Sequence, residues 1–517
     1  MQSRRTMALF LLSLPLIAQN EPYIGDWRAP AGDPVSSPRV PCAALRSLTG
    51  YEFTIITAVS VAASADAPAF CRAIGQVLPE IRFELNLPAS WNRRLYMFGN
   101  GGYAGEDLES SGRARHRNRA LQMGFAVTST NTGHDARQEP LGTFAVNSQK
   151  LFDYAFRSLH ITAETAKKLA AIYYGAAPTR SYFYGCSTGG RQGLILAQRF
   201  PQDFDGIVVG MPVLDFTGTM VRYAASIRAL EAAPIAPVKL KPLADRVYAH
   251  CDPKDGLQDG LIDDPRRCDF KPSEHVPKCA GAEGPDCFTE AQIQALTVIY
   301  SDVMSQGKRV FPGQPVGAEI AGPNGRPGWD RWLVQDAGKT IGLSFAETFF
   351  RYMAFPEKNP DYQVSQFDLE KDLARLAWIS QVLDATDPEL APFRDRGGKI
   401  LMYFGWADPA LNPRMGVEYY ESVLRHMGPG ARDFFRLYMM PGVFHCGGGV
   451  GPAAFDPLDH VIRWVEQGAA PESIRASLLQ EGKVLRTRPL CPYPHVAKYK
   501  GSGSVDDAAN FTCASPE

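Results

Sequence analysis

The stretch YFYGCSTGGRQG, residues 182–193, limits the folds open to this chain more than any other part of the sequence. The aromatic run from Arg180 is typical of a buried strand, and RQGLILAQRF after it has the pattern of a helix. Gly185 and Gly189 allow the sharp turn between them and leave Ser187 projecting at the helix N-terminus. The stretch therefore predicts Ser187 as a candidate nucleophile; the alternative is a turn with a purely structural role.

Short strand-like runs, rich in β-branched and aromatic residues, alternate with helix-like segments along the chain. This alternation predicts an α/β fold with a largely parallel sheet. Each run ends in small or polar residues, and the carboxyl edge of such a sheet is where ligands and catalytic groups gather. The predicted strands begin at Arg94, Phe125, Arg180, Phe204, Lys399 and Phe434.

The length of 517 residues exceeds what one hydrophobic core normally serves. It predicts either one large domain with a substantial insertion or two domains. A hydrophobic fraction of 45% and a charged fraction of 21% are typical of soluble globular proteins. The 54 basic and 55 acidic residues nearly cancel, so the charge balance does not favour nucleic acid as a partner.

The N-terminus, MQSRRTMALFLLSLPLIAQN, has the composition of a secretory signal. Its apolar run from Met7 to Ala18 is too short to span a bilayer. We therefore expect a signal peptide over residues 1–18 and a secreted or periplasmic mature protein, with Arg4 and Arg5 leaving twin-arginine export open. No later segment is long and apolar enough for a membrane helix, so no membrane partner is expected.

The chain has ten cysteines, an even number, which in an exported protein predicts disulfide bonds rather than free thiols. Four pairs follow from their positions, two within short loops and one near each end of the chain: Cys251–Cys268, Cys279–Cys287, Cys42–Cys71 and Cys491–Cys513. Cys186 and Cys446 remain.

A serine nucleophile needs a base, and the base needs an orienting acid, in the chain order Ser, Asp, His of hydrolases. Asp408, in YFGWADPALNP, follows a predicted strand and is the candidate acid; the alternative is a turn-forming Asp-Pro pair. His445, in MMPGVFHCGGG, follows another strand downstream and is the candidate base. His134, in TNTGHDA, is the rival base.

Cys186 precedes Ser187 directly, just as Cys446 follows His445 directly. If the two cysteines are bonded, their Cα atoms lie within about 7 Å and the serine and histidine are brought together. The alternative is that Cys186 is itself a thiolate nucleophile, which export and the even cysteine count disfavour.

The run FGNGG, from Phe98 to Gly102, ends the first predicted strand with glycines whose N–H groups can approach a ligand. It resembles the oxyanion loop that follows an early strand in esterases. The predicted oxyanion donors are the N–H groups of Gly101, Gly102 and Thr188, the residue after the nucleophile. A simple β-turn is the alternative.

The stretch CDPKDGLQDGLIDDPRRC, residues 251–268, is called the Asp-rich loop below. It offers closely spaced oxygen ligands of the kind Ca²⁺ prefers: the carboxylates of Asp252, Asp255 and Asp259 and the carbonyls of Leu257 and Leu261. Lys254 at the third position and the lack of a closing glutamate distinguish it from an EF-hand. The alternative is a solvated acidic loop closed by a disulfide.

Taken together, FGNGG, GCSTGGRQG, CDPKDGLQDGLI, GWADP and FHCGGG resemble the tannase and feruloyl esterase family, which includes mono(2-hydroxyethyl) terephthalate hydrolases. The resemblance implies an α/β-hydrolase core with a large lid inserted between the nucleophile and the acid. It also implies a structural calcium in the lid, held by the five ligands above, and a disulfide between Cys186 and Cys446. By position, Ser187 is the nucleophile, Asp408 the orienting acid and His445 the base.

The resemblance places the hydrolase core at residues 19–212 and 398–517 and the lid at 213–397. The resemblance implies that aromatic residues of the lid contact the substrate ring, and the lid contains Trp329, Trp332, Phe345, Phe349, Phe350 and Tyr352. The candidate substrate contacts are Trp329, Phe349 and Phe350 of the lid and Leu411 of the core. The alternative is that these aromatic residues form the core of the lid.

The expected activity is hydrolysis of small esters of aromatic acids, of feruloyl, galloyl, chlorogenate or terephthalate monoester type, through an acyl-enzyme. A serine peptidase or amidase shares the same triad and is the first alternative. A secreted binding protein that kept the fold and lost catalysis is the second. The sequence does not decide among the esters, and a monomer is favoured.

Overall fold

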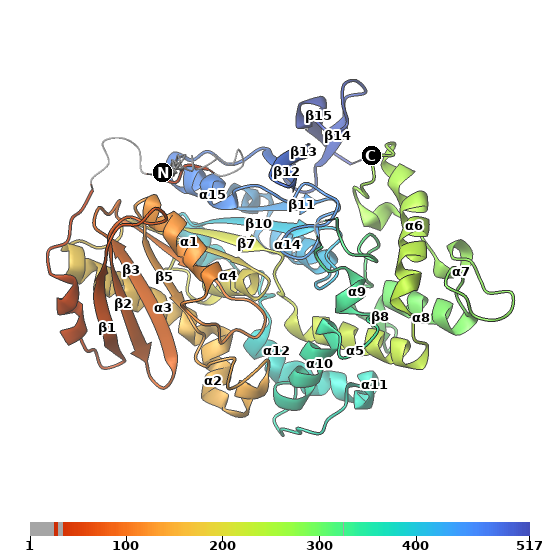
Figure 1. Cartoon of the computed structure of the whole chain (residues 1–517), viewed down its shortest axis with the longest axis horizontal. Coiled ribbons are helices and arrows are strands. Elements are labelled where there is room, and N and C mark those ends of the chain that lie inside the picture. Colours follow the sequence, from red (N-terminus) through yellow and green to blue (C-terminus); the bar gives the residue numbers. More distant parts are fainter. Residues whose placement is uncertain (1–24, 29–34, 324, 517) are drawn as a thin grey trace, which may run out of the picture.

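The computed structural model describes residues 25–28, 35–323 and 325–516 (Figure 1). The expected signal peptide, residues 1–18, lies outside these described residues. A nine-stranded sheet runs through the centre of the molecule in the order β1-β2-β3-β5-β4-β6-β7-β10-β11. In the described part of the chain, no helix is both long and apolar enough to cross a membrane.

The six strands predicted from the sequence are all present, and they lie side by side in parallel. They are β4 (Arg94–Phe98), β5 (Ala126–Thr130), β6 (Arg180–Cys186), β7 (Gly206–Gly210), β10 (Lys399–Gly405) and β11 (Phe435–Met440). The largely parallel α/β sheet is therefore confirmed. Its register sets Cys186 opposite Gly210, so neighbouring strands end together at one edge.

Three N-terminal strands extend the sheet in antiparallel fashion beyond β5. They are β1 (Phe53–Val61), β2 (Phe70–Val77) and β3 (Ile81–Pro88), and the sequence motifs point to none of them. A second hydrophobic cluster holds them against α3 (Ser158–Tyr174). Within it, Trp91 stacks on Tyr174 with ring centroids 4.3 Å apart.

Helices cover both faces of the sheet because each carries an apolar stripe that must be buried. The longer helices of the core are α1 (Ser111–Gln122), α3, α4 (Thr188–Arg199), α14 (Pro413–Met427) and α15 (Pro457–Gln467), and α2 (Ser148–Phe152) precedes α3. The α4 helix packs closely on β7, since an added side chain at Gly193 would press on Ile207 and Val209. The tight elbow before α4 is therefore fixed to the middle of the sheet.

The chain between β7 and β10, residues 211–398, adds no strand to the nine-stranded sheet in its described part. Figure 1 shows this insertion, coloured yellow-green to cyan, on the side of the sheet away from β1–β3. Its exit and return segments meet, because the Ala385 N–H donates to the Leu214 carbonyl at 2.7 Å. Assignment of residues 213–397 as a lid stays a prediction.

The insertion is mostly helical, with one small hairpin. Its elements are α5 (Phe216–Ala232), α6 (Leu240–Cys251), α7 (Pro272–His275), α8 (Glu290–Tyr300), β8 (Val303–Ser305), β9 (Lys308–Phe311), α9 (Trp329–Trp332), α10 (Ile341–Tyr352), α11 (Leu369–Asp372), α12 (Ala377–Leu383) and α13 (Ala391–Asp395).

The C-terminal segment forms two hairpins after α15. Their strands are β12 (Ile474–Gln480), β13 (Lys483–Leu490), β14 (Val496–Tyr499) and β15 (Phe511–Ala514). Arg488 of β13 is buried and forms an ion pair with Asp259 of the insertion. The C-terminal segment is thereby bound to the Asp-rich loop.

All ten cysteines are joined in five disulfides, and every predicted pair is present. Four of the bridges close stretches of fewer than thirty residues, whereas Cys186–Cys446 joins residues 260 positions apart. No free cysteine occurs in the described ranges. The long-range bridge links the end of β6 to the loop after β11.

Candidate active site

Ser187 lies at the turn between β6 and α4, in a left-handed backbone conformation with φ of 64° and ψ of −122°. Few residues other than glycine adopt a positive φ, and such strain concentrates at functional sites. A side chain at Gly185 would overlap the Gly189 backbone, and one at Gly190 would overlap the Gly210 carbonyl. The glycines of this motif are therefore required by close packing, and the turn presents the half-buried Ser187 at the sheet edge.

Asp408 follows β10, and its carboxylate is completely buried and fully hydrogen-bonded. Oδ1 accepts the N–H groups of Ala410 and Leu411, both at 2.9 Å, and Oδ2 accepts Nδ1 of His445 at 2.8 Å. Because Nδ1 donates to Asp408, the Nε2 atom of His445 carries the free lone pair. An imidazole held in this way is ready to accept a proton from a hydroxyl.

The Cys186–Cys446 bridge brings the neighbours of Ser187 and His445 to a Cα–Cα distance of 6.0 Å. The Cys446 sulfur lies 3.8 Å from Nε2 of His445, so the bridge is in direct contact with the imidazole. Since both sulfurs are in the bridge, Cys186 is not a thiolate, and that alternative is wrong. The disulfide connects the elbow to the histidine loop.

The rival base, His134, lies elsewhere and has a different environment. It is buried and stacks on Phe144 with ring centroids 4.0 Å apart. Burial lowers its pKa to about 4. The carboxylate of Asp408 binds His445 instead, so the structure favours His445 as the base.

The glycine-rich loop after β4 corrects one predicted oxyanion donor. The N–H of Gly101 donates to Oε1 of Glu106 at 2.9 Å and is therefore not free to bind an oxyanion. The Gly102 N–H has no acceptor among the described residues, and the Gly102 carbonyl accepts the Thr188 hydroxyl. Thr188 begins α4, where the first N–H groups lack an intrahelical partner. Gly102 and Thr188 therefore remain as candidate donors.

Comparison with known proteins identifies the family. The family model described as tannase and feruloyl esterase matches residues 66–514. The chain is 33% identical to the mono(2-hydroxyethyl) terephthalate hydrolase of Piscinibacter sakaiensis, over 89% of this chain and 87% of that protein. It is 34% identical to an uncharacterized esterase of Xanthomonas campestris pv. campestris, over 91% of each chain.

The chain belongs to the tannase and feruloyl esterase family. It is accordingly a carboxylic ester hydrolase. The crystal structure of feruloyl esterase B from Aspergillus oryzae superimposes with a TM-score of 0.81 at 25% identity, covering 92% of this chain and all of that one. The α/β-hydrolase fold expected from the resemblance is thus confirmed.

In this esterase, the three aromatic residues chosen as candidate substrate contacts lie in the interior of the insertion. Trp329, Phe349 and Phe350 are almost completely buried and pack on other aromatic rings of the insertion, such as Tyr300, Phe216 and Phe367. Leu411 is also buried, and its N–H binds Asp408. The three aromatic side chains therefore belong to the interior of the insertion, which is the alternative stated for them from the sequence. Leu411 lies outside the insertion, after β10.

Two other aromatic side chains of the insertion lie beside the triad. Trp332 meets the His445 ring edge-to-face at 5.7 Å, and it stacks on Phe345 at 6.4 Å. The Phe345 ring lies 3.2 Å from the point where a Cβ of Gly102 would stand. Both rings are only partly buried. Their sequence gives no signal that separates them from the buried aromatic residues, because burial depends on packing between distant helices.

The Asp-rich loop contains the predicted calcium ligands, and hydrogen bonds within the protein already engage their carboxylates. Among the described residues, no group of three or more His, Cys, Asp or Glu side chains is placed to hold a metal ion. The Asp252 carboxylate accepts the N–H groups of Asp259 and Gly260, and the Asp255 carboxylate accepts that of Leu257. The Asp259 carboxylate is occupied by Arg488 and by the Leu261 N–H.

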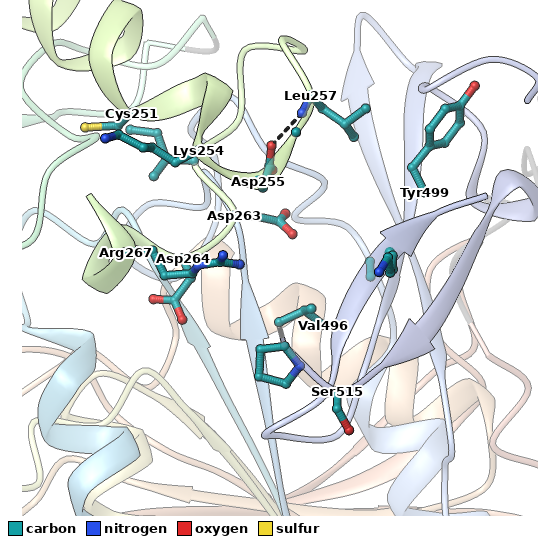
Figure 2. Close-up of a pocket in the computed structure, with 15 residues that line it drawn as sticks. Cys251, Lys254, Asp255, Leu257, Asp263, Asp264, Arg267, Val496, Tyr499 and Ser515 are labelled. Atoms are coloured by element: carbon teal, nitrogen blue, oxygen red, sulfur yellow. Dashed lines mark hydrogen bonds between the residues drawn. The ribbon is translucent and has the colours of Figure 1, made fainter. Parts of the chain in front are cut away.

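The charges in this loop are nevertheless poorly compensated. Burial raises the pKa of Asp252 and of Asp255, and repulsion from Asp259 raises each further. Figure 2 shows Asp263, a residue the motif did not single out, projecting into a pocket of about 190 Å³ between the loop and β14. Burial and then repulsion from Asp255 raise the pKa of Asp263 to about 7. The oxygen-only donor set fits a hard cation in its chemistry.

Proposed function

We propose that this esterase hydrolyses esters of aromatic carboxylic acids through an acyl-enzyme formed on Ser187. The observation that carries the proposal is the buried hydrogen bond between Asp408 and His445, tied by the Cys186–Cys446 bridge to the Ser187 elbow. A buried acid, an oriented base and a strained serine turn form the constellation used for acyl transfer.

In the first step, Nε2 of His445 takes the proton of the Ser187 hydroxyl while its oxygen attacks the ester carbonyl. The Asp408 carboxylate stabilises the imidazolium that results. The N–H groups of Gly102 and Thr188 donate to the oxyanion. His445 then gives its proton to the departing alcohol, and a water molecule repeats the sequence on the acyl-enzyme to release the acid.

The aromatic character of the acid is inferred from Trp332 and Phe345. Both are half-buried rings at the triad, one against His445 and the other against Gly102. Flat aromatic walls favour a flat aromatic ligand through stacked or edge-to-face contacts. Two similar proteins bear names that specify esters of aromatic acids, mono(2-hydroxyethyl) terephthalate hydrolase and feruloyl esterase B.

We further propose a structural Ca²⁺ in the Asp-rich loop, held by the carboxylates of Asp252, Asp255 and Asp259 with the carbonyls of Leu257 and Leu261. The uncompensated carboxylates of the loop support it, because a divalent cation would offset their repulsion. Binding would require Asp259 to share or leave its ion pair with Arg488. The cation takes no part in the reaction.

Secretion is part of the same proposal. Five disulfides with no free cysteine in the described residues fit a protein that folds in an oxidising compartment. The expected signal peptide supplies the export route. N-terminal sequencing of the protein recovered from the medium or periplasm tests it, and a mature chain that still begins at Met1 would contradict it.

The deciding experiment measures initial rates on methyl gallate, methyl ferulate, chlorogenate, mono(2-hydroxyethyl) terephthalate and a short p-nitrophenyl ester. Ser187→Ala is assayed beside the wild type, with Ser60→Ala on the exposed surface of β1 as the matched control. We expect a strong preference for one aromatic ester and a loss of about 10⁴-fold or more in the Ser187 variant alone.

Other outcomes separate the alternatives. Amides that turn over as fast as esters would favour a peptidase or amidase. Failure of Ser187 to react with a fluorophosphonate would favour a binding protein without catalysis. Turnover of only the activated p-nitrophenyl ester would leave the triad in place and remove the aromatic-acid assignment.

A further inference from the structure

The glycine-rich loop after β4 leaves only one of its four amides without an acceptor. Three N–H groups are satisfied inside the protein: Gly99 donates to the Tyr184 carbonyl (2.9 Å), Asn100 to Oε1 of Gln192 (3.0 Å) and Gly101 to Oε1 of Glu106 (2.9 Å). In the described chain, the Gly102 N–H has none. Because interior N–H groups are nearly always paired, the spare one is the group available to a ligand.

Glu106 is the only carboxylate that binds this loop within the described residues. Its second oxygen, Oε2, accepts Nδ2 of Asn100 at 2.9 Å and forms an ion pair with Arg113. Arg113 belongs to α1, is buried, and lies over the Phe98 ring with its guanidinium carbon 4.8 Å from the centroid. Glu106 therefore connects two consecutive loop residues to a fixed helix.

On the side of Glu106, the glycine-rich loop borders a cavity and is not packed against other side chains. A cavity of about 630 Å³ borders it, and its wall includes Gly101, Glu106, Arg113 and both sulfur-bearing residues Cys186 and Cys446. Atoms that face a cavity lack the dispersion contacts that hold a packed segment in place. The hydrogen bonds of Glu106 are then what restrains the loop toward α1.

We propose that Glu106 is a positioning residue for the oxyanion loop. Its carboxylate fixes the peptide between Asn100 and Gly101. Together with the Ala104 N–H, which donates to the Gly101 carbonyl at 2.9 Å, it sets the direction of the next N–H, that of Gly102. That N–H donates to the ester oxygen as negative charge develops on it. Glu106 touches no reacting atom. This inference rests on the proposed function, and its test distinguishes a failure of the inference from a failure of the proposed function.

The primary variant is Glu106→Gln, which keeps the size of the side chain. The glutamine oxygen can still accept the Gly101 N–H, but its NH₂ group then faces Nδ2 of Asn100 and the Arg113 guanidinium, both of which are donors. Loss of one oxyanion donor typically costs 10²–10³ in kcat, so a misdirected donor should cost about 10- to 100-fold. KM for methyl ferulate should change little.

A second readout separates positioning from a general structural role. An aryl boronic acid forms a tetrahedral adduct on the serine and places an oxygen at the oxyanion position, whereas ferulate binds as a planar product. We expect the inhibition constant of the boronic acid to rise by the factor by which kcat/KM falls. The inhibition constant of ferulate should not change.

Two further variants serve as comparison. Glu109→Gln, three residues along and exposed in an ion pair with Arg72, should retain wild-type kinetics. Glu106→Asp keeps the charge beside Arg113 but shortens the reach to Gly101, so it should reproduce the kcat loss with an unchanged melting temperature. This second variant decides the question if Glu106→Gln fails to fold.

Wild-type values of kcat and of the boronic acid inhibition constant in Glu106→Gln and Glu106→Asp would overturn the positioning role, provided that Ser187→Ala is inactive. Equal weakening of boronic acid and ferulate would also overturn it, because the defect would then be structural. If the wild-type protein neither hydrolyses an ester nor binds the boronic acid, the proposed function fails as well.

Discussion

Two regions of this esterase carry aspartates in loops, and they balance the negative charge in opposite ways. At the active site, Asp408 receives three hydrogen bonds and needs no further partner. In the Asp-rich loop, Asp252 and Asp255 accept backbone N–H groups, yet desolvation and repulsion from Asp259 still raise their pKa values. The protein itself therefore balances the charge of Asp408, whereas it does not fully balance the charges of Asp252 and Asp255.

The difference indicates two kinds of requirement. A catalytic acid must have one orientation at every turnover, so the chain supplies all of its partners. A loop that binds a cation must leave oxygen atoms uncompensated, because charges that are fully paired have no affinity left for the ion. The comparison predicts that changes in the first region affect the rate and that changes in the second affect stability.

The largest effect should follow from Asp408→Asn. The amide can present its NH₂ group to the histidine and favour the wrong tautomer, so kcat should fall by about 10³- to 10⁴-fold. Steady-state kinetics on the preferred ester measure the loss, and thermal unfolding should show a folded protein. If the variant retains more than a tenth of wild-type kcat, Asp408 does not have the orienting role that the comparison assigns to it.

A smaller effect is expected where the insertion meets the triad. Trp332→Ala removes the ring that faces His445, so KM for aromatic esters should rise about tenfold through lost contact area. The p-nitrophenyl ester of acetate serves as the internal control and should be hydrolysed with little change. An equal effect on both esters would show that Trp332 orients His445 rather than contacting the acid.

Removal of calcium tests the other region. Dialysis against EGTA should lower the melting temperature by several degrees, and adding Ca²⁺ back should restore it, since binding to the folded state alone stabilises that state. Elemental analysis of the untreated protein should find one calcium per chain. An unchanged melting curve together with no calcium would remove the site.

A matched pair of variants sharpens this result. Asp252→Asn should abolish the effect of EGTA and leave kcat near the wild-type value. Asp245→Asn, on the exposed surface of α6 beside Lys241, should leave both the melting temperature and its response to EGTA as in the wild type. A parallel loss of kcat in Asp252→Asn would mean that the two regions are coupled.

The smallest effect concerns two aspartates outside both regions, Asp215 just before α5 and Asp384 just after α12. Burial, followed by repulsion from Asp384, raises the pKa of Asp215 to about 7. The folded state therefore holds this proton more tightly than the unfolded chain, whose aspartates titrate near 3.9. Stability from this group is present below about pH 4 and is lost as the pH rises toward and through 7.

Asp215→Asn keeps a side chain that can accept the Gly218 N–H at the start of α5 but carries no charge. The variant should melt a few degrees above the wild type at pH 8, and the difference should shrink toward pH 5. Thermal unfolding at both pH values checks this. A difference that grows toward pH 5 would show the opposite sign and place the proton on another group.

The local motifs could be predicted because each is specified by neighbouring residues. Gly185 and Gly189 determine the turn around Ser187, and the order of Ser187, Asp408 and His445 along the chain matches the order of the strands that carry them. The cysteine pairs followed partly from their spacing in the chain. The bridge between Cys186 and Cys446 was implied by the family resemblance.

What could not be predicted depends on contacts between distant segments. The sequence around Trp329 and Trp332 does not show which ring is buried, because distant residues decide it: Tyr300 of α8 packs on Trp329, whereas Phe345 of α10 and His445 contact Trp332. The role of Gly101 was misjudged for the same reason: its N–H is taken by Glu106, whose position depends on Arg113 of α1. The three antiparallel strands carry no catalytic motif that would single them out.

The sequence by itself determined the parallel sheet, the serine turn, the candidate acid and base, and the family, since these rest on short stretches and on chain order. Only the tertiary structure decided which N–H groups remain free, which aromatic rings reach His445 and how completely each buried aspartate is compensated. Those properties depend on contacts with groups from several helices, strands and loops, and no single stretch of sequence contains all of these partners.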